Sequence, residues 1–184
     1  AMATSGPGAT NLLTGIGSCH FDSSPAVFIT GQVNLNEQKG ERAIRQLGFQ
    51  ETDIVAMAEP ITKRAWRVKT AQELPDILNQ AFRLAVQGRP GPVLVDIPMD
   101  LQRAQVEAVA PLGPGPSTPP ESQTYLEQLT RALSRARQPL ILAGGGVPAS
   151  ATSAQLLALA EETGVPVVTS LMGLDSIPFD HPLR

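Results

Sequence analysis

The residues with the clearest potential for chemistry are two glycines on either side of a proline near the start of the chain. Gly6 and Gly8 lack a Cβ atom and Pro7 has a fixed φ, so the main chain can bend sharply and let a flat ring approach it closely. Residues 9–19 follow with apolar side chains at helical spacing, which predicts a helix whose first amides point at this bend. Such strand-to-helix loops bind ligands in parallel α/β sheets. The bend therefore predicts a ligand site, with an ordinary tight turn as the alternative.

A second glycine-rich turn lies in the last third of the chain. The run Gly144-Gly145-Gly146-Val147-Pro148-Ala149 follows an apolar strand pattern and precedes a helix, and it fits the G-x-G-x-x-A pattern of nucleotide-binding turns. An acidic residue is expected about 20 positions later, but the next strand ends in Thr169 and Ser170. The sequence therefore argues against an NAD site, and a tight turn without a ligand is the alternative.

Composition excludes several kinds of partner and site. With 42% hydrophobic and 17% charged residues, the 184-residue chain can bury a core. A net charge of −3 without a basic run argues against nucleic acid and anionic membrane surfaces as partners. Cys19 is the single cysteine and the two histidines are His20 and His181, so no internal disulfide and no Cys/His metal cluster can form. No apolar run approaches the roughly 20 residues that span a bilayer, and we expect a cytoplasmic protein.

Strand and helix patterns alternate along the chain and predict an α/β fold with a parallel sheet. Short apolar runs predict strands buried on both faces, and Thr70 with Glu73 forms a capping box before an amphipathic helix. Strands are predicted at 26–30, 61–69, 92–98, 139–143 and 165–170, and helices at 9–19, 42–47, 70–87, 122–137 and 150–163. The chain starts in an apparent buried strand and ends without a helix stop signal, so we expect an internal fragment of a longer protein.

Three segments, taken together and in this order, resemble thiamine-diphosphate enzymes of the acetolactate (acetohydroxyacid) synthase type. They are Ala3-Thr4-Ser5-Gly6-Pro7-Gly8-Ala9-Thr10-Asn11, Phe28-Ile29-Thr30-Gly31-Gln32-Val33 and Gly48-Phe49-Gln50-Glu51-Thr52. The resemblance covers nearly the whole chain. It implies that residues 1–108 are the C-terminal part of a parallel-sheet, three-layer pyrimidine-binding domain, that 109–120 are a Pro/Gly-rich linker, and that 121–184 begin a Rossmann-like central domain of the FAD/ADP-binding kind.

The resemblance also implies positions for a thiamine site. Pro7 and Asn11 match positions that lie against the pyrimidine ring, and Gln50 matches a Gln on the cofactor and substrate side. Lys63 matches a lysine at the end of Ile-Thr-Lys near the site. The alternatives are a capping or surface role for Asn11, a solvated loop position for Gln50 and a solvated strand-end charge for Lys63.

A second set of matches concerns FAD. In the family, the Gly-Gly-Gly turn, the Thr-Ser-Leu-Met-Gly-Leu segment and the Arg of Gly-Arg-Pro-Gly-Pro contact this cofactor. The matching positions are Gly145, Ser170, Leu171 and Arg89. The alternatives are a ligand-free turn for the glycines and, for Arg89, a surface charge at the carboxyl end of the preceding helix.

The activity that the resemblance implies is decarboxylation of a 2-oxo acid on thiamine diphosphate and transfer of the two-carbon unit to an acceptor, by a homodimer or homotetramer. Such enzymes need a Glu upstream of the Gly-Pro-Gly bend and a Gly-Asp-Gly segment that holds Mg²⁺ and the diphosphate. Neither is in this sequence, and Glu51 belongs to a different motif. We therefore assign no catalytic residue and no metal ligand, and expect the chain to be inactive alone.

The sequence departs from the usual acetolactate synthase pattern between Gln32 and Phe49. Asn34 stands where a proline commonly follows Gly-Gln-Val, and the connection is several residues longer than usual. Substrate identity is therefore open among glyoxylate carboligase, sulfoacetaldehyde acetyltransferase, oxalyl-CoA decarboxylase and pyruvate oxidase types. A non-catalytic nucleotide-binding or structural α/β module is the alternative from another class.

Overall fold

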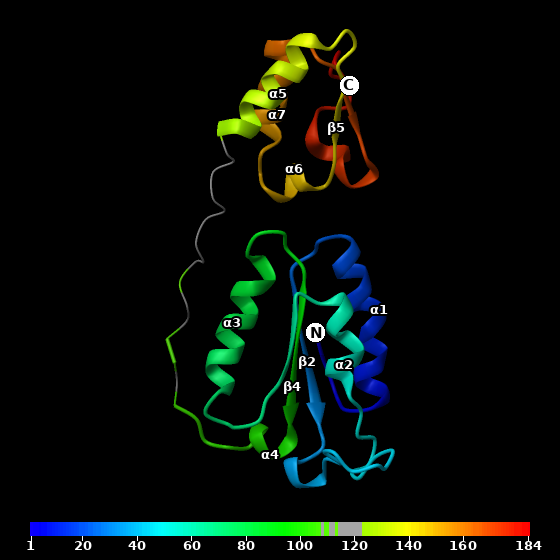
Figure 1. Ribbon diagram of the computed structural model, residues 1–184, viewed down its shortest axis with the longest axis vertical. Helices are drawn as coiled ribbons and strands as arrows, with labels where there is room; N and C mark the ends of the chain where they lie inside the picture. Colours follow the sequence, from blue (N-terminus) through cyan, green and yellow to red (C-terminus); the bar gives the residue numbers. More distant parts are fainter. Residues whose placement is uncertain (108, 111–112, 114–122) are drawn as a thin grey trace. The chain divides into compact units, whose positions relative to one another are not determined.

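The chain forms two compact units, Ala1–Thr118 and Pro119–Arg184 (Figure 1). The computed structural model describes residues 1–107, 109–110, 113 and 123–184. Most of the predicted linker at 109–120 therefore lies outside the described residues.

The first unit is built on a parallel sheet of four strands in the order β1-β2-β4-β3. The strands are β1 (Met2–Ala3), β2 (Ala26–Gln32), β3 (Arg64–Arg67) and β4 (Pro92–Pro98). All seven residues of β4 are buried, as predicted for a central strand covered on both faces.

Helices cover both faces of this sheet, which confirms the predicted three-layer α/β class (Figure 1). The helices are α1 (Pro7–Phe21) and α2 (Ile54–Ala58) on one face and α3 (Leu74–Val86) on the other, and the short α4 (Met99–Gln102) follows β4. Ile77 and Ala81 of α3 pack with Val93 and Val95 of β4. On the opposite face Leu94 packs with residues of α1 and α2, because successive side chains of a strand point to opposite sides.

The helix predicted at 42–47 does not form. Those residues are irregular, and the short helical turns nearby are η1 (Leu35–Glu37) and η2 (Glu59–Ile61). The reason is the Glu51 carboxylate, which accepts hydrogen bonds from the main-chain amides of Lys39 (2.7 Å) and Leu47 (2.8 Å). A side chain from outside the segment thus binds the amide of Leu47, which a helix over 42–47 would otherwise use, and also an amide that precedes the segment.

Only half of the predicted capping box forms before α3. The Glu73 carboxylate accepts from the amides of Lys69 and Thr70, which lowers its pKa, while the helix itself begins at Leu74 rather than at Thr70. The predicted helix end is confirmed, because α3 stops at Val86 and Gly88 follows with φ +61°.

The second unit contains a two-stranded parallel sheet of β5 (Ile141–Ala143) and β6 (Val167–Thr169). Its helices are α5 (Gln123–Arg135), α6 (Gly146–Ala149), α7 (Ser153–Thr163) and the 3₁₀ segment η3 (Leu171–Ser176). The core consists of Ala143, Ala160, Val167 and Ile177. Gly164 ends α7 in the left-handed conformation at φ +65°, as predicted for a helix stop.

Candidate functional site

The glycine-proline bend lies between β1 and the start of α1. Gly6 has φ +60° and ψ −125°, a conformation that glycine adopts at low cost, and Pro7 occupies the first turn of the helix. A Cβ atom on Gly6 would lie 2.6 Å from the Cβ of Gln50, and one on Gly8 would lie 2.7 Å from the Cγ2 of Thr4. The bend therefore has no room for side chains of its own, and the loop that carries Gln50 packs directly against it.

Gln50 itself has φ +60°, an uncommon conformation for a residue other than glycine. Its main-chain oxygen accepts a hydrogen bond from the hydroxyl of Thr52 (3.2 Å), and its side chain is half-buried. Pro7 and Asn11 are exposed on α1. The structure thus brings the bend and Gln50 into contact and places Asn11 one helical turn beyond Pro7.

Behind this contact lies a buried carboxylate that the sequence analysis missed. Asp96 of β4 is completely buried, its Oδ1 accepts from the Thr30 hydroxyl (2.7 Å), and its Oδ2 accepts from the Gln32 side-chain amide (3.2 Å). Burial raises the pKa of Asp96 to about 6, while the hydrogen bonds from Thr30 and Gln32 oppose the shift. The sequence signal was a polar residue in each of two strands predicted to be buried on both faces.

Gln32 continues this network into the loop. Its Nε2 also donates to the main-chain oxygen of Thr52 (2.7 Å), and its Oε1 accepts from the amide of Val33 (3.0 Å). Gln32 thereby connects the sheet to the segment that contains Gln50.

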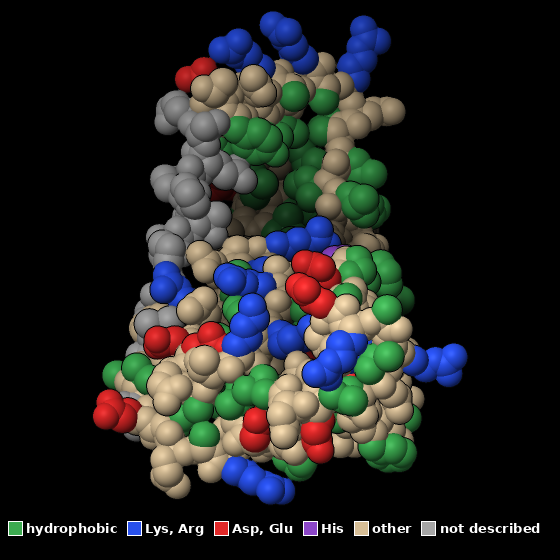
Figure 2. Space-filling view, turned by 60° about the horizontal axis from the view of Figure 1, so that its bottom comes forward, with side chains coloured by type: hydrophobic (Ala, Val, Ile, Leu, Met, Phe, Trp, Pro, Cys, Tyr) green, Lys and Arg blue, Asp and Glu red, His purple; other side chains and the backbone are tan. Residues whose placement is uncertain are grey.

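A small polar cavity of about 130 Å³ adjoins the network. Charged side chains of both signs line it, and Arg67 forms an ion pair with Asp53. Its lining residues are Gln32, Gln38, Lys39, Gly40, Arg45, Glu51, Thr52, Asp53 and Arg67. Basic and acidic side chains are likewise interspersed over the face shown in Figure 2. The cavity suits a small polar or charged group.

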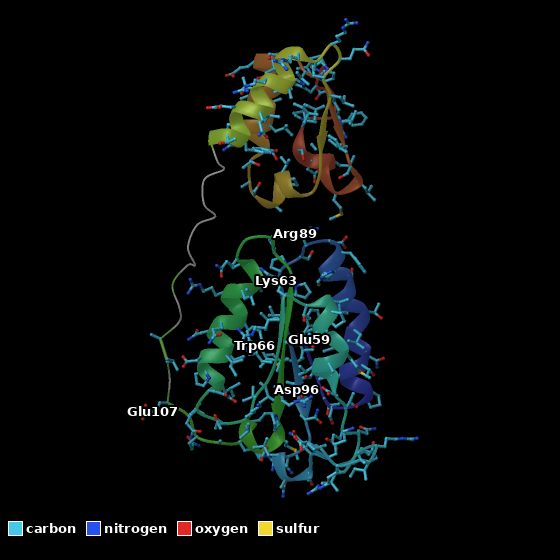
Figure 3. The ribbon with its side chains drawn as sticks, viewed as in Figure 1. Glu59, Lys63, Trp66, Arg89, Asp96 and Glu107 are labelled. Atoms are coloured by element: carbon cyan, nitrogen blue, oxygen red, sulfur yellow. The ribbon has the colours of Figure 1, made fainter. Side chains whose placement is uncertain are left out.

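Lys63 and Arg89 lie at the opposite end of β4 from Asp96 (Figure 3). The Lys63 ammonium donates to the main-chain oxygens of Leu84 and Gln87 at the end of α3, and burial lowers the pKa of Lys63. The Arg89 Nε donates to the Ser23 hydroxyl (2.7 Å). The positive charge at the carboxyl end of α3 is therefore that of Lys63 and not that of Arg89.

Both cations line a cavity of about 330 Å³ together with His20, Phe21, Pro90 and Gly91. The structure thus brings Lys63 and Arg89 together but does not bring them to Gln50. Their contact with a cofactor stays a prediction.

In the second unit the two segments predicted to contact FAD lie side by side. A Cβ on Gly145 would lie 2.9 Å from the Cβ of Met172, and the amide of Ser170 donates to the main-chain oxygen of Ala143 (2.9 Å). Leu171 is 82% exposed and Ser170 is also exposed. The turn after β5 and the segment after β6 therefore form one surface at the carboxyl end of this sheet.

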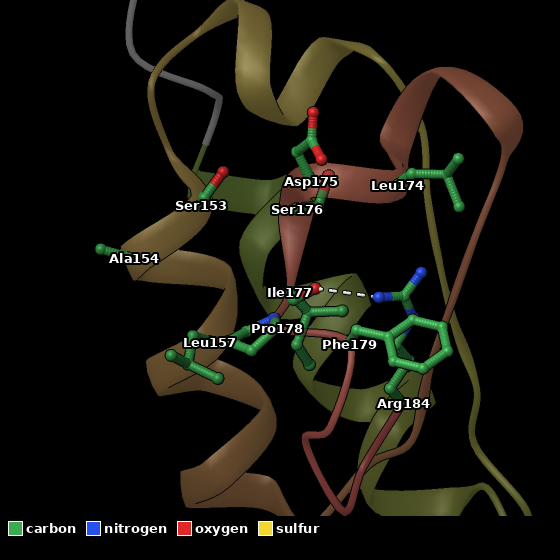
Figure 4. A pocket seen from close by; sticks show the side chains of 10 residues that line it. All are labelled: Ser153, Ala154, Leu157, Leu174, Asp175, Ser176, Ile177, Pro178, Phe179 and Arg184. Atoms are coloured by element: carbon green, nitrogen blue, oxygen red, sulfur yellow. Dashed lines mark hydrogen bonds between the residues drawn. The ribbon is translucent and has the colours of Figure 1, made fainter.

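A cavity of about 470 Å³ in the second unit does not include the predicted FAD contacts (Figure 4). It lies between α7 and the last residues, where the Arg184 guanidinium donates to the main-chain oxygen of Ile177 (3.4 Å) and lies over the Phe179 ring at 4.8 Å. The Ser176 hydroxyl is buried and has no hydrogen-bond partner among the residues that the structure describes. The lining residues are Ser153, Ala154, Leu157, Leu174, Asp175, Ser176, Ile177, Pro178, Phe179 and Arg184.

Within the described ranges, no three or more His, Cys, Asp or Glu side chains are grouped to hold a metal ion. A search of the same residues finds no helix with the length and apolar character needed to cross a membrane.

Comparison with known proteins finds two family profiles that match parts of the chain. The profile of the thiamine pyrophosphate enzyme N-terminal TPP binding domain matches residues 1–57, which include the bend and Gln50. The profile of the thiamine pyrophosphate enzyme central domain matches residues 126–184.

Similar full-length proteins are acetolactate synthases. The chain is 43% identical to the acetolactate synthase large subunit of Corynebacterium glutamicum, over 100% of the chain and 29% of that protein. It is 40% identical to a probable acetolactate synthase large subunit of Methanocaldococcus jannaschii, over 99% of the chain and 31% of that protein. It is 43% identical to the chloroplastic acetolactate synthase 2 of Zea mays, over 99% of the chain and 28% of that protein. The chain thus spans less than one third of the length of these relatives.

Proposed function

We propose that this chain, which belongs to the thiamine pyrophosphate enzyme family, supplies the pyrimidine-binding side of an enzyme of the acetolactate synthase type. The observation that carries the proposal is the contact between the Gly6 bend and Gln50 at the carboxyl end of the sheet, inside the segment that matches the TPP binding domain. Parallel α/β sheets bind their ligands at this end.

The residues at the bend suit a flat heterocycle. Gly6 is buried against Gln50 and Gly8 packs against Thr4, while the ring of Pro7 is exposed and Asn11 presents a side-chain amide nearby on α1. Gln50, held in its uncommon conformation, would orient the substrate side of the site. When bound, thiamine diphosphate would supply the carbon centre at which a 2-oxo acid loses carbon dioxide.

The other cofactors and the assembly are part of the same proposal. Mg²⁺ would be held with the diphosphate by residues outside this chain, since the chain contains no Gly-Asp-Gly segment. FAD would lie against Gly145, Ser170 and Leu171 of the second unit. We further propose a cytoplasmic homodimer or homotetramer, and no turnover by the 184-residue chain alone.

The experiment is an assay of pyruvate consumption by the full-length protein that contains this chain, with and without thiamine diphosphate and Mg²⁺. We expect consumption to depend on thiamine diphosphate and to fall in the Gln50→Ala variant. Consumption that is independent of thiamine diphosphate would overturn the proposal.

A second substrate class has its own supporting observation. The loop after Val33 places Lys39 and Arg45 at the polar cavity beside Gln32, where Glu51 and Asp53 also lie. The basic side chains would favour a substrate with an additional negative charge, such as oxalyl-CoA. Glyoxylate, oxalyl-CoA and sulfoacetaldehyde, offered to the full-length protein one at a time against pyruvate, distinguish these possibilities. The substrate with the largest kcat/KM identifies the acyl donor.

A further inference from the structure

The face of the sheet beneath α1 and α2 changes from apolar to polar along its length. Phe28 and Leu94 pair in the middle of β2 and β4 and belong to the hydrophobic core. Two residues further along each strand, on the same face, Thr30 pairs with Asp96, and Gln32 follows. Each of these three polar side chains is at least 94% buried, and the great majority of polar groups so deeply buried have hydrogen-bond partners.

The hydrogen bonds of this buried group run outward to the loop. Thr30 satisfies one oxygen of Asp96, and the other oxygen holds the Gln32 amide group, which donates from the same nitrogen to the main chain at Thr52. The Gln32 oxygen is also occupied, by the amide of Val33. Asp96 therefore fixes the orientation of the Gln32 amide, and Gln32 fixes the position of Thr52.

The position of Gln50, two residues before Thr52, depends on the hydrogen bond between Gln32 and Thr52. Gln50 keeps a left-handed φ of +60°, which a residue with a side chain holds only where its surroundings enforce it. The Thr52 hydroxyl contributes by donating to the main-chain oxygen of Gln50, and the Gln50 Cβ rests against Gly6. A shift of Thr52 would therefore move Gln50 along the surface of the bend.

We propose that Asp96 is a positioning residue for Gln50, acting through the side chain of Gln32 and the main chain of Thr52. The inference rests on the proposed function for its kinetic consequence, but the linkage itself concerns only residues of this chain. Asp96 needs no contact with substrate or cofactor to act in this way.

The first test needs no cofactor. Hydrogen exchange of the amides at 47–53 is measured in the 184-residue chain for Gln32→Leu and Asp96→Asn, with Val93→Ala as the control that weakens the same strand at its other end. We expect about tenfold faster exchange at 47–53 in the first two variants, the loss of about one hydrogen bond, and no selective change there in the control. Fluorescence of the single tryptophan, Trp66, verifies that each variant is folded. Unchanged protection at 47–53 in both variants would overturn the proposal.

The second test is kinetic and uses the full-length protein. Gln32→Leu and Asp96→Asn should lower kcat by up to about 100-fold, the effect of displacing a group that orients a substrate, with a smaller change in the affinity for thiamine diphosphate. In a Gln50→Ala background the same two substitutions should cause little further loss. Equal losses in both backgrounds would show that Asp96 acts independently of Gln50 and would overturn the proposal.

The two tests separate this inference from the proposed function. A full-length protein without thiamine-dependent turnover defeats the proposed function, and the exchange measurement still decides whether Asp96 holds the Gln50 loop.

Discussion

The charged side chains at the two ends of β4 lie in different surroundings. At the amino end, Lys63 donates hydrogen bonds to the last carbonyls of α3, and Arg89 donates one to a hydroxyl in the turn before β2. At the carboxyl end, the Asp96 carboxylate is removed from water completely and is held by side chains of β2. The first arrangement completes the fold at little cost, whereas the second costs stability and therefore points to a use beyond folding.

The largest effect is expected from Gly6→Ala, compared with Gly88→Ala at the other end of β4. Both glycines have φ near +60°, but a Cβ at Gly6 would collide with Gln50, while one at Gly88 meets no atom of the described residues within 4 Å. Gly88→Ala should cost about 1 kcal/mol for the backbone conformation alone. Gly6→Ala should cost about 1–3 kcal/mol more, because of the collision and because ψ −125° at this φ is unfavourable for any residue with a Cβ, and it should abolish thiamine-dependent activity in the full-length protein. Urea unfolding followed by Trp66 fluorescence measures the difference. Equal costs at the two positions would contradict the contact with Gln50.

The second largest effect is expected on the pH dependence of the unfolding free energy, and it arises from Asp96 at the carboxyl end of β4. The folded-state pKa of Asp96, about 6, lies above its usual value of 3.8, so the folded state binds the proton more tightly than the unfolded state does. The cost of the buried charge is absent below about pH 4, develops between pH 4 and 6, and is fully present above that range. Asp96→Asn removes this cost.

The free energy of unfolding of Asp96→Asn, relative to the native chain, should therefore rise by up to about 3 kcal/mol between pH 4 and pH 7. Urea titrations of both proteins at the two pH values measure this change. A difference between the two proteins that stays constant with pH would argue against a carboxylate buried in its charged form.

A smaller effect is expected at the amino end from Lys63→Met. Methionine keeps most of the apolar stem but removes the ammonium that donates to the carbonyls of Leu84 and Gln87. The free energy of unfolding should fall by about 1–2 kcal/mol, because the end of α3 loses hydrogen bonds to a charged group. No loss of stability would mean that Lys63 does not serve the helix end.

The smallest effect is expected from Ser23→Ala, which removes the hydroxyl that accepts from Arg89. Both residues are accessible to solvent, so water replaces the lost hydrogen bond and the change in unfolding free energy should stay within about 0.5 kcal/mol. A loss of unfolding free energy several times that size would argue against the difference between the two ends of β4.

The sequence was sufficient for the features that depend on local pattern. The apolar run of β4, the apolar stripe of α3 and the helix stop at Gly164 were all predicted from residues near one another in the chain. The bend and Gln50 were predicted as parts of a site because their motifs are distinctive. Their direct contact was beyond the sequence, since it depends on how two loops pack.

Features that depend on distant partners were missed. Asp96 stands out only once the sheet register sets it opposite Thr30, 66 residues earlier in the chain. The helix predicted at 42–47 does not form because the carboxylate of Glu51 accepts from the amide of Leu47, at the end of that stretch, and from the amide of Lys39, which precedes it. In both cases the deciding interaction comes from a side chain outside the segment itself.

The two hydrogen bonds of Glu51 also make the stretch between Lys39 and Leu47 modular. One carboxylate accepts from the amides at both ends of this stretch, so the residues between them form a closed loop. A change in the length of this loop is not expected to move Gln50. We therefore expect that changes in the length of 40–46 leave the bend and its neighbouring loop in place. Insertions in this stretch should accordingly be tolerated better than insertions at the bend itself.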